Sequence, residues 1–174
     1  MDALHEVVRR HWGYSSLRPL QHEAMLAAVK GRDSLVVLPT GGGKSLCYQA
    51  PAMLASKPTV VVSPLIALMK DQVDRLIDRG IPSAFLNSSL DAADRRRVSA
   101  GIMEGRYKLI FVAPERFATD YFFRVLGDAG VGAFAIDEAH CISHWGHDFR
   151  PEYRQLAVLR ERFPAASIHA YTAT

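Results

Sequence analysis

The stretch SLVVLPTGGGKS, residues 34 to 45, decides the fold of this chain. It begins with a short apolar, β-branched run that is typical of a buried strand. Three consecutive glycines follow, and they let backbone N–H groups turn inward to surround an anion. The chain then continues as a helix, which directs its positive end toward the same place. A strand, a glycine loop and a helix in this order predict a phosphate-binding loop.

Two polar residues of this loop have predicted roles. Lys44 can reach the β- and γ-phosphates of a nucleotide, and the Ser45 hydroxyl can ligate Mg²⁺. The pattern is a Walker A motif in which Leu38 takes the place of the first glycine. The alternative is a flexible glycine turn, which the strand and the helix on either side disfavour. The residues expected to bind the nucleotide here are Thr40, Gly41, Gly42, Gly43, Lys44 and Ser45.

Further apolar runs alternate with helical patterns along the chain. They are apolar on both faces, which is typical of parallel strands covered by helices on both sides. This alternation predicts an α/β fold with a mostly parallel sheet and helices on both faces, whose chemistry gathers at the carboxyl ends of the strands. The expected strands are residues 34–38, 59–63, 83–86, 109–113, 133–137 and 168–172.

Capping residues and breakers mark the expected helices. Ser63 is expected to cap the helix after the second strand, with Pro64 in its first turn and Gly80 at its end. The core-facing stripe of this helix is expected at Leu65, Met69, Val73 and Leu76. The other expected helices run from Pro19 to Gly31, from a cap at Ser88, Ser89 or Asp91 toward Gly105, and from Pro151 to Pro164.

Composition and charge are those of an ordinary globular protein. Of the 174 residues, 49% are hydrophobic and 22% are charged, which suits one domain with a sizeable core. The net charge of +3 permits an anionic partner without requiring one. Asp2 and Glu6 argue against a signal peptide, and no apolar run reaches the length of a membrane span. Cys47 and Cys141 form no CxxC pair, so a reducing compartment is expected.

A second motif ends the fifth expected strand with two carboxylates. Asp137 would hold Mg²⁺ through water, and Glu138 would polarise the water that attacks the γ-phosphate. The alternative, a pair of surface acids, is disfavoured by the phosphate loop upstream. The stretch reads Asp-Glu-Ala-His, which is found in helicase-type ATPases, so His140 joins Lys44 and the two acids as expected catalytic residues.

These motifs resemble those of the first, N-terminal RecA-like motor domain of RecQ-type ATP-dependent DNA helicases. The resemblance covers nearly all 174 residues. It implies a RecA-like P-loop NTPase domain over residues 1–174, without the second RecA-like domain or the family's zinc-binding and winged-helix regions. The matching segments are WGYSSLRPLQ (12–21), LPTGGGKS (38–45), VVSPLIALMKDQV (61–73), DEAH (137–140), CISHWGHDFRPEY (141–153) and TAT (172–174).

The resemblance implies how ATP, with Mg²⁺ as its metal, is held. Tyr14 and Arg18 would sandwich the adenine ring, and Gln21 would hydrogen-bond its polar edge. Adenine offers a flat π-face to a ring and a guanidinium, and an amide can both donate and accept. Without the family, Tyr14 would be interpreted as a core aromatic and Gln21 as a surface residue. The metal would lie on Ser45 and Asp137.

The resemblance places DNA at the same edge of the sheet. Ser63 and Pro64 would hold the DNA backbone, together with residues 113–116 at the end of another strand. Thr172 and Thr174, in the last matching segment, would couple ATP hydrolysis to DNA binding.

Aromatic side chains lie among polar ones directly after the two acids. Trp145 and Phe149 could stack on bases of single-stranded DNA, which is worth about 1–3 kcal/mol per base. Arg150 could add a phosphate contact, and a strand bound here could adjust the position of Glu138. The alternative is that Trp145 and Phe149 form a small satellite core.

The same segment raises the alternative of a zinc site. His140, Cys141, His144 and His147 have ligand-like spacings. Structural zinc favours paired ligands from separate turns, whereas these residues would all lie in one short loop. His140 would more naturally bond toward the γ-phosphate. His144 stands where the family more often has Gln or Glu.

The run of arginines at residues 95–97 is a candidate DNA-binding patch. Consecutive residues on a helix spread around most of a turn, so the three side chains cannot form one stripe. We therefore predict that they are solvated charges.

The sequence thus predicts the motor lobe of an ATP-dependent 3′→5′ DNA helicase. Its expected partners are single-stranded DNA, partly unwound duplex DNA and a second RecA-like domain, without which we expect weak ATP hydrolysis and no unwinding. The alternative is a stand-alone, nucleotide-dependent DNA-binding module. An RNA helicase is disfavoured by the adenine and aromatic motifs, and a GTPase by the lack of an Asn-Lys-x-Asp motif. The expected location is the bacterial cytoplasm, in association with the nucleoid, or the nucleus of a eukaryote, with no membrane partner.

Overall fold

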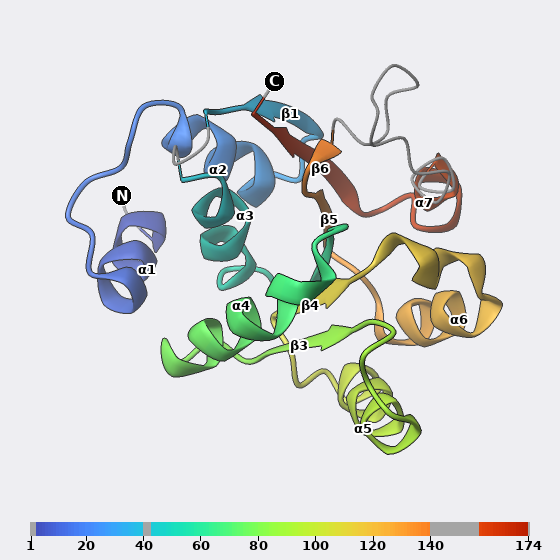
Figure 1. Ribbon diagram of the computed structural model, residues 1–174. Coiled ribbons are helices and arrows are strands. Elements are labelled where there is room, and N and C mark those ends of the chain that lie inside the picture. Colours follow the sequence, from blue (N-terminus) through green and yellow to red (C-terminus); the bar gives the residue numbers. More distant parts are fainter. Residues whose placement is uncertain (1–2, 40–42, 140–156, 174) are drawn as a thin grey trace.

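A single parallel sheet of six strands runs through the molecule (Figure 1). The strands are β1 (Ser34–Val37), β2 (Thr59–Val62), β3 (Ser83–Leu86), β4 (Leu109–Val112), β5 (Ala133–Ile136) and β6 (Ser167–Thr172). Their order across the sheet is β1-β6-β5-β2-β4-β3, and every neighbouring pair is parallel. The structure is a computed structural model, and it describes residues 3–39, 43–139 and 157–173.

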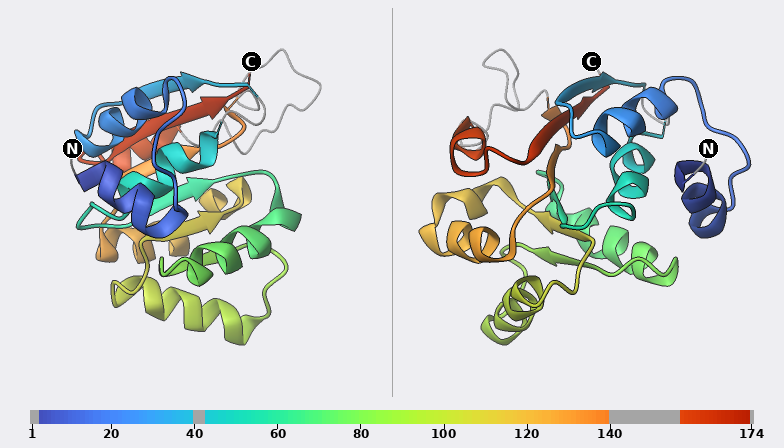
Figure 2. Two further views of the ribbon diagram at one scale, coloured as in Figure 1. Left: turned by 90° about the vertical axis from the view of Figure 1, so that its left-hand side faces the viewer. Right: turned by 180° about the vertical axis from the view of Figure 1, so that it is seen from behind.

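Helices cover both faces of the sheet, as Figures 1 and 2 show. The helices are α1 (Ala3–Trp12), α2 (Gln21–Val29), α3 (Lys44–Ala52), α4 (Ile66–Asp78), α5 (Ala92–Met103), α6 (Asp120–Ala129) and α7 (Ala157–Arg162), with the 3-10 helix η1 (Pro114–Ala118). One face packs against α2, α3 and α4, and the other against α5, α6 and α7. The helix α1 lies outside, against α2 and α3. Among the described helices, none is long and apolar enough to cross a bilayer.

The strands alternate their side chains between these two cores. In β2, Val60 and Val62 face α5 to α7, whereas Val61 faces α2 to α4. All residues of β2 and of β4 are buried. Burial on both faces explains why these strands are continuous apolar runs rather than alternating ones.

The carboxyl ends of β2, β3, β4 and β5 lie level with one another, and those of β1 and β6 extend two residues farther. Backbone hydrogen bonds continue one residue beyond the ladders. The Leu38 N–H donates to the Thr172 carbonyl at 3.0 Å, and the Asp137 N–H donates to the Val62 carbonyl at 2.9 Å. The loops that follow β1, β2 and β5 therefore leave the sheet along one edge, where ligands of parallel sheets bind.

The predicted strands agree with the observed ones to within one residue at each end. The predicted α/β fold is therefore confirmed. The expectation of two covered faces is wrong for β1, whose Leu35 and Val37 side chains are 70% and 50% exposed. The reason is position: β1 is an edge strand among those described, and Val36 faces the α2 to α4 core.

The helix after β2 differs from the prediction at its start. Its first residue is Ile66, and Ser63 does not cap it. Instead, Ser63 Oγ accepts a hydrogen bond from the Leu65 N–H at 3.2 Å, a local turn that competes with helix formation. Leu65 is consequently outside the core, with 40% of its surface exposed. The rest of the predicted stripe is buried, namely Met69, Val73 and Leu76.

Other helix ends follow the sequence signals. Of the candidate caps for α5, the structure selects Asp91, whose carboxylate accepts a hydrogen bond from the Asp94 N–H at 2.8 Å. The helix α7 ends at Arg162, before Pro164. Its predicted start at Pro151 lies outside the described residues. The sequence analysis did not predict α1 or α6.

We predict that the same Leu→Ala substitution lowers the free energy of unfolding by very different amounts in β4 and in β1. Leu109 is fully buried in β4, so Leu109→Ala should lower the free energy of unfolding by roughly 2–5 kcal/mol. Leu35 in β1 is the matched control, because Leu35→Ala at an exposed site should change it by less than about 0.5 kcal/mol. Urea unfolding measures both. Similar costs for the two variants would contradict the assignment of β1 as an uncovered strand.

Candidate nucleotide-binding site

The helix α3 begins at the end of the glycine-rich loop. Its N-cap is Gly43, which has a φ of 83°, and its first residues are Lys44 and Ser45. A Cβ at position 43 would lie 2.1 Å from Gln21 Nε2, so this position requires glycine for its backbone conformation and for space. The N–H groups in the first turn of a helix have no partner within the helix and suit a phosphate. The rest of the predicted loop lies outside the described residues, namely Thr40, Gly41 and Gly42.

The two acids after β5 lie beside this helix. Lys44 Nζ is 3.9 Å from Glu138 Oε1, and both side chains are largely buried. The Glu138 N–H donates to Asp137 Oδ1 at 3.0 Å. Glu138 has a φ of 55°, an uncommon conformation for a residue with a side chain and one that is often found at functional sites. The structure thus brings together three of the predicted catalytic residues.

The donors at this point fit the predicted Mg²⁺. The Asp137 carboxylate is only 8% exposed, at the tip of its strand. Hard oxygen donors are the ligands that Mg²⁺ prefers, and it is typically bound by one or two carboxylates together with substrate phosphates. Asp137 and the Ser45 hydroxyl supply such oxygens. A cation would also offset the cost of keeping this carboxylate charged away from water.

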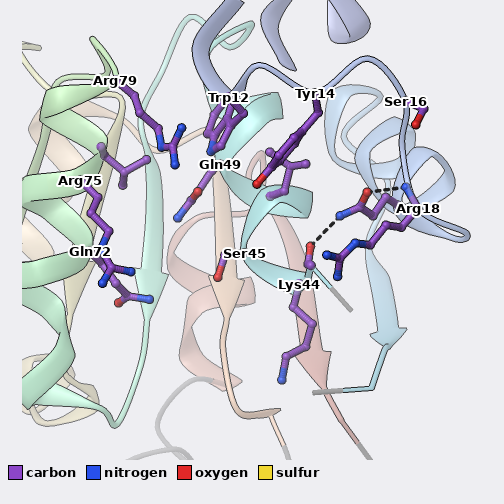
Figure 3. A pocket seen from close by; sticks show the side chains of 14 residues that line it. Trp12, Tyr14, Ser16, Arg18, Lys44, Ser45, Gln49, Gln72, Arg75 and Arg79 are labelled. Carbon is purple, nitrogen blue, oxygen red and sulfur yellow. Dashed lines mark hydrogen bonds between the residues drawn. The ribbon is translucent and has the colours of Figure 1, made fainter. Parts of the chain in front are cut away.

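A cavity of about 650 Å³ opens beside α3. Its volume is within the range of small-molecule sites. Figure 3 shows Tyr14 and Arg18 on one side of it, and Arg75 of α4 and its C-cap residue Arg79 on the other. Tyr14 is 51% exposed, so it is not a core aromatic. The other lining residues are Trp12, Ser16, Gln21, Gly43, Lys44, Ser45, Leu46, Gln49, Gln72 and Leu76.

Gln21 connects the loop that carries Tyr14 to the phosphate loop. Its side chain is buried; Oε1 accepts a hydrogen bond from the Arg18 N–H at 2.7 Å, and Nε2 donates to the Gly43 carbonyl at 3.1 Å. The alternative that Gln21 is a surface residue is therefore wrong. An amide has a second N–H and a second lone pair, so the predicted contact with adenine remains compatible with this bridge and stays a prediction.

The sequence analysis missed the part of the cavity wall that α4 provides. The Arg79 guanidinium lies 5.9 Å from the centroid of the Trp12 ring, and its Nη1 donates to the His11 carbonyl at 3.2 Å. His11 Nδ1 in turn lies 2.7 Å from the Arg79 carbonyl oxygen. The end of α1 is thereby fixed to the end of α4. The available signal was the four-residue spacing of Arg75 and Arg79, which places both on one helix face.

Buried aromatic rings support α3 from the side of β6. The ring centroids of Tyr48 and Tyr171 are 5.4 Å apart. Burial raises the pKa of both phenols, and the negative charge of Asp137 raises it further. Burial also raises the pKa of the Cys47 thiol to about 12, so Cys47 is a packing residue and not a nucleophile.

The predicted DNA-binding and coupling residues are described only in part. Ser63 and Thr172 are buried at the carboxyl edge, and Pro64 is partly exposed there. Other predicted residues lie outside the described part of the chain, namely His140, Trp145, Phe149, Arg150 and Thr174, as do the alternative zinc ligands Cys141, His144 and His147. Within the described ranges, no cluster of three or more His, Cys, Asp or Glu side chains could hold a metal.

Comparison with known proteins agrees with this geometry. Residues 18–174 match the family model for the DEAD/DEAH box helicase. The chain belongs to this family. It is 51% identical over 174 residues to the ATP-dependent DNA helicase RecQ of Pasteurella multocida (strain Pm70). The aligned region covers all of this chain and 27% of that relative. It is 45% identical over 170 residues to the ATP-dependent DNA helicase RecQ of Bacillus subtilis (strain 168), and this aligned region covers 97% of this chain and 29% of that relative.

These findings confirm the resemblance to RecQ-type helicases and set its extent. The chain spans little more than a quarter of the length of these relatives. Among solved structures, the DUF1998 helicase MrfA has a TM-score of 0.77 at 19% identity, and its DNA-bound form has 0.75 at 18%. Each comparison covers all of this chain and less than a third of the other. At such low identity the likeness shows the shared RecA-like fold.

We predict that the close approach of Gln21 makes Gly43 indispensable for nucleotide binding. Gly43→Ala adds a Cβ that must displace the amide, so it should weaken ATP binding and also lower stability. Gly105→Ala is the matched control, because Gly105 has a φ of 73° with no atom within 4 Å of the added Cβ. That variant should cost about 1–2 kcal/mol of stability from backbone strain alone and leave ATP affinity unchanged. Calorimetric titration with ATP and urea unfolding separate the two effects, and equal ATP affinities would contradict the prediction.

Proposed function

We propose that this chain is the ATP- and single-stranded-DNA-binding motor lobe of a RecQ-type 3′→5′ DNA helicase. The observation that carries the proposal is the approach of Lys44 to Glu138, 3.9 Å apart, beside a cavity lined by Tyr14 and Arg18. Identities of 45% and 51% to proteins named as RecQ helicases support DNA as the polymer.

The residues of the site divide the work on ATP among them. The N–H groups at the start of α3 and Lys44 would hold the phosphates, while Tyr14 and Arg18 would hold the base. Asp137, through water, and Ser45 would hold Mg²⁺, which supplies charge neutralisation when bound. Glu138 would polarise the attacking water. The Lys44–Glu138 pair would open to admit the γ-phosphate between the two side chains.

DNA would lie along the carboxyl edge of the sheet. Ser63 and Pro64, directly after β2, would contact the backbone of the strand. Trp145 and Phe149 would stack on unpaired bases, and Arg150 would bind a phosphate. Because this aromatic segment directly follows Glu138 in the chain, binding of a strand could change the position of the hydrolytic carboxylate.

A second RecA-like domain would complete the motor. Such a domain supplies an arginine finger, which is worth roughly 10³–10⁵ in the rate of hydrolysis. We therefore expect these 174 residues alone to bind ATP weakly, to hydrolyse it very slowly and not to unwind duplex DNA. Brisk strand separation by the chain alone would contradict this part of the proposal.

We predict that Lys44→Ala weakens ATP binding roughly 10- to 100-fold, because a charged hydrogen bond to phosphate is lost. Calorimetric titration of the chain with ATP and Mg²⁺ measures this change. Lys70→Ala is the matched control, since Lys70 is exposed on α4 and pairs with Asp74 at 2.7 Å. An unchanged affinity in Lys44→Ala would overturn the proposed nucleotide site. Turnover that stays absent with single-stranded DNA and a restored second lobe would favour a DNA-binding module instead.

We also predict that Trp145→Ala, in the full-length protein, uncouples DNA binding from ATP hydrolysis. Loss of one stacked base should weaken binding of single-stranded DNA by roughly 5- to 150-fold and abolish its stimulation of hydrolysis, with ATP affinity near normal. Fluorescence anisotropy and steady-state turnover measure the two effects. Trp12→Ala is the matched control, because Trp12 lines the nucleotide cavity and its loss should affect ATP affinity instead. Equal loss of both activities together with the fold would favour a satellite core.

A further inference from the structure

A second cavity, of about 250 Å³, lies between α5, η1 and the start of α6. Arginines from two separate elements line it: Arg95 and Arg96 of α5, and Arg116 of η1. Among the described residues, those that line it include no carboxylate. A small cavity lined by three arginines, with no acid among the described lining residues, has a positive potential, which favours an anionic occupant.

The geometry of α5 explains how two of its three consecutive arginines reach this cavity. Arg95, Arg96 and Ser99 all line it, and their spacing places them on one face of the helix. Arg97 points elsewhere and pairs with Asp94 at 3.3 Å. The prediction that residues 95–97 are all solvated charges is therefore wrong for Arg95, which is half-buried because it donates to the Leu90 carbonyl at 2.8 Å.

The polar groups around the cavity are incompletely satisfied. Arg116 Nε is buried and has no hydrogen-bond partner among the described residues. Ser99 is 7% exposed and also lines the cavity. A buried donor without a partner is destabilising, and an anion with several acceptor oxygens would offset that cost.

The start of α6 adds a further favourable element. Its N-cap, Thr119, forms no side-chain cap, because its hydroxyl donates to the Arg116 carbonyl at 3.0 Å. An uncapped helix N-terminus carries a partial positive charge and free N–H groups. The nearby acid Asp120 does not line the cavity; it is 90% exposed and lies 3.8 Å from Arg162.

We propose that this cavity binds a phosphate group through Arg95, Arg96 and Arg116. Guanidinium groups match the geometry of phosphate oxygens and are the usual choice for such recognition. The cavity is lined by Leu86 at the end of β3 and by Arg116 in η1, which follows β4, whereas Lys44 and Glu138 follow β1 and β5 in the chain. The strands β3 and β1 are at opposite ends of the strand order (Figure 1). The phosphate would come from the backbone of a DNA strand, in which case the inference rests on the proposed function, or from a small phosphorylated compound.

The test compares Arg96→Gln with its neighbour Arg97→Gln in the 174-residue chain. Both remove one exposed positive charge from α5, but only Arg96 lines the cavity. The first probe is a fluorescent oligothymidylate, titrated at several salt concentrations. The second probe is inorganic phosphate, followed through the amide NMR signals of Ser99 and Thr119, which report on this cavity and not on the nucleotide site.

If the phosphate belongs to DNA, Arg96→Gln should weaken oligothymidylate binding roughly tenfold and reduce the salt slope by about 0.7, with Arg97→Gln less affected. If it belongs to a small compound, oligothymidylate binding should not distinguish the variants, and the response to inorganic phosphate should be lost in Arg96→Gln alone. If neither probe distinguishes the two variants, the inference is overturned. Failure of the proposed function would be visible separately, as ATP affinity that is unchanged in Lys44→Ala.

Discussion

The candidate site of this protein depends on the fixed register of its parallel strands. The strands β2, β3, β4 and β5 end at one level, and β1 and β6 end two residues beyond it. Single hydrogen bonds extend the ladders past the strands, as from Leu38 to Thr172 and from Asp137 to Val62. Separate loops, far apart in the chain, are thereby held at fixed positions along one edge. A phosphate loop and a metal-binding acid need this precision, because their side chains must meet within a few ångströms of the same phosphate.

The sequence was sufficient for the sheet and for the closeness of Lys44 and Glu138 at the candidate nucleotide site. Strand positions could be predicted because strands buried on both faces must be apolar throughout, a constraint that each run shows independently. The approach of Lys44 to Glu138 could be predicted because Lys44 begins the helix after β1 and Glu138 lies two residues after β5. The exposure of β1 could not, since the apolar residues Leu35 and Val37 read the same whether or not another element covers them. The first residue of α4 was predicted wrongly because it depends on a single hydrogen bond, which the Leu65 N–H donates to the Ser63 hydroxyl oxygen.

Contacts between elements distant in the chain were the least predictable part of the site. The pairing of Arg79 with Trp12 requires knowing that α4 ends beside α1, which no local pattern shows. The second cavity depends in the same way on α5 and η1 meeting, because neither Arg96 nor Arg116 is distinctive alone. A run of like charges on a helix therefore says little until the neighbouring elements are placed.

The bridge formed by Gln21 has a thermodynamic consequence. One amide bonds to the Arg18 backbone and to the Gly43 carbonyl, so the segment that carries Tyr14 and Arg18 and the start of α3 are linked through one side chain. A ligand that shifts either loop changes the free energy of the other, and linkage requires that the effect be equal in both directions. Binding of the base and binding of the phosphates of the proposed nucleotide would then be coupled. A free base or a free phosphate would each bind less tightly than its own contacts with the protein suggest.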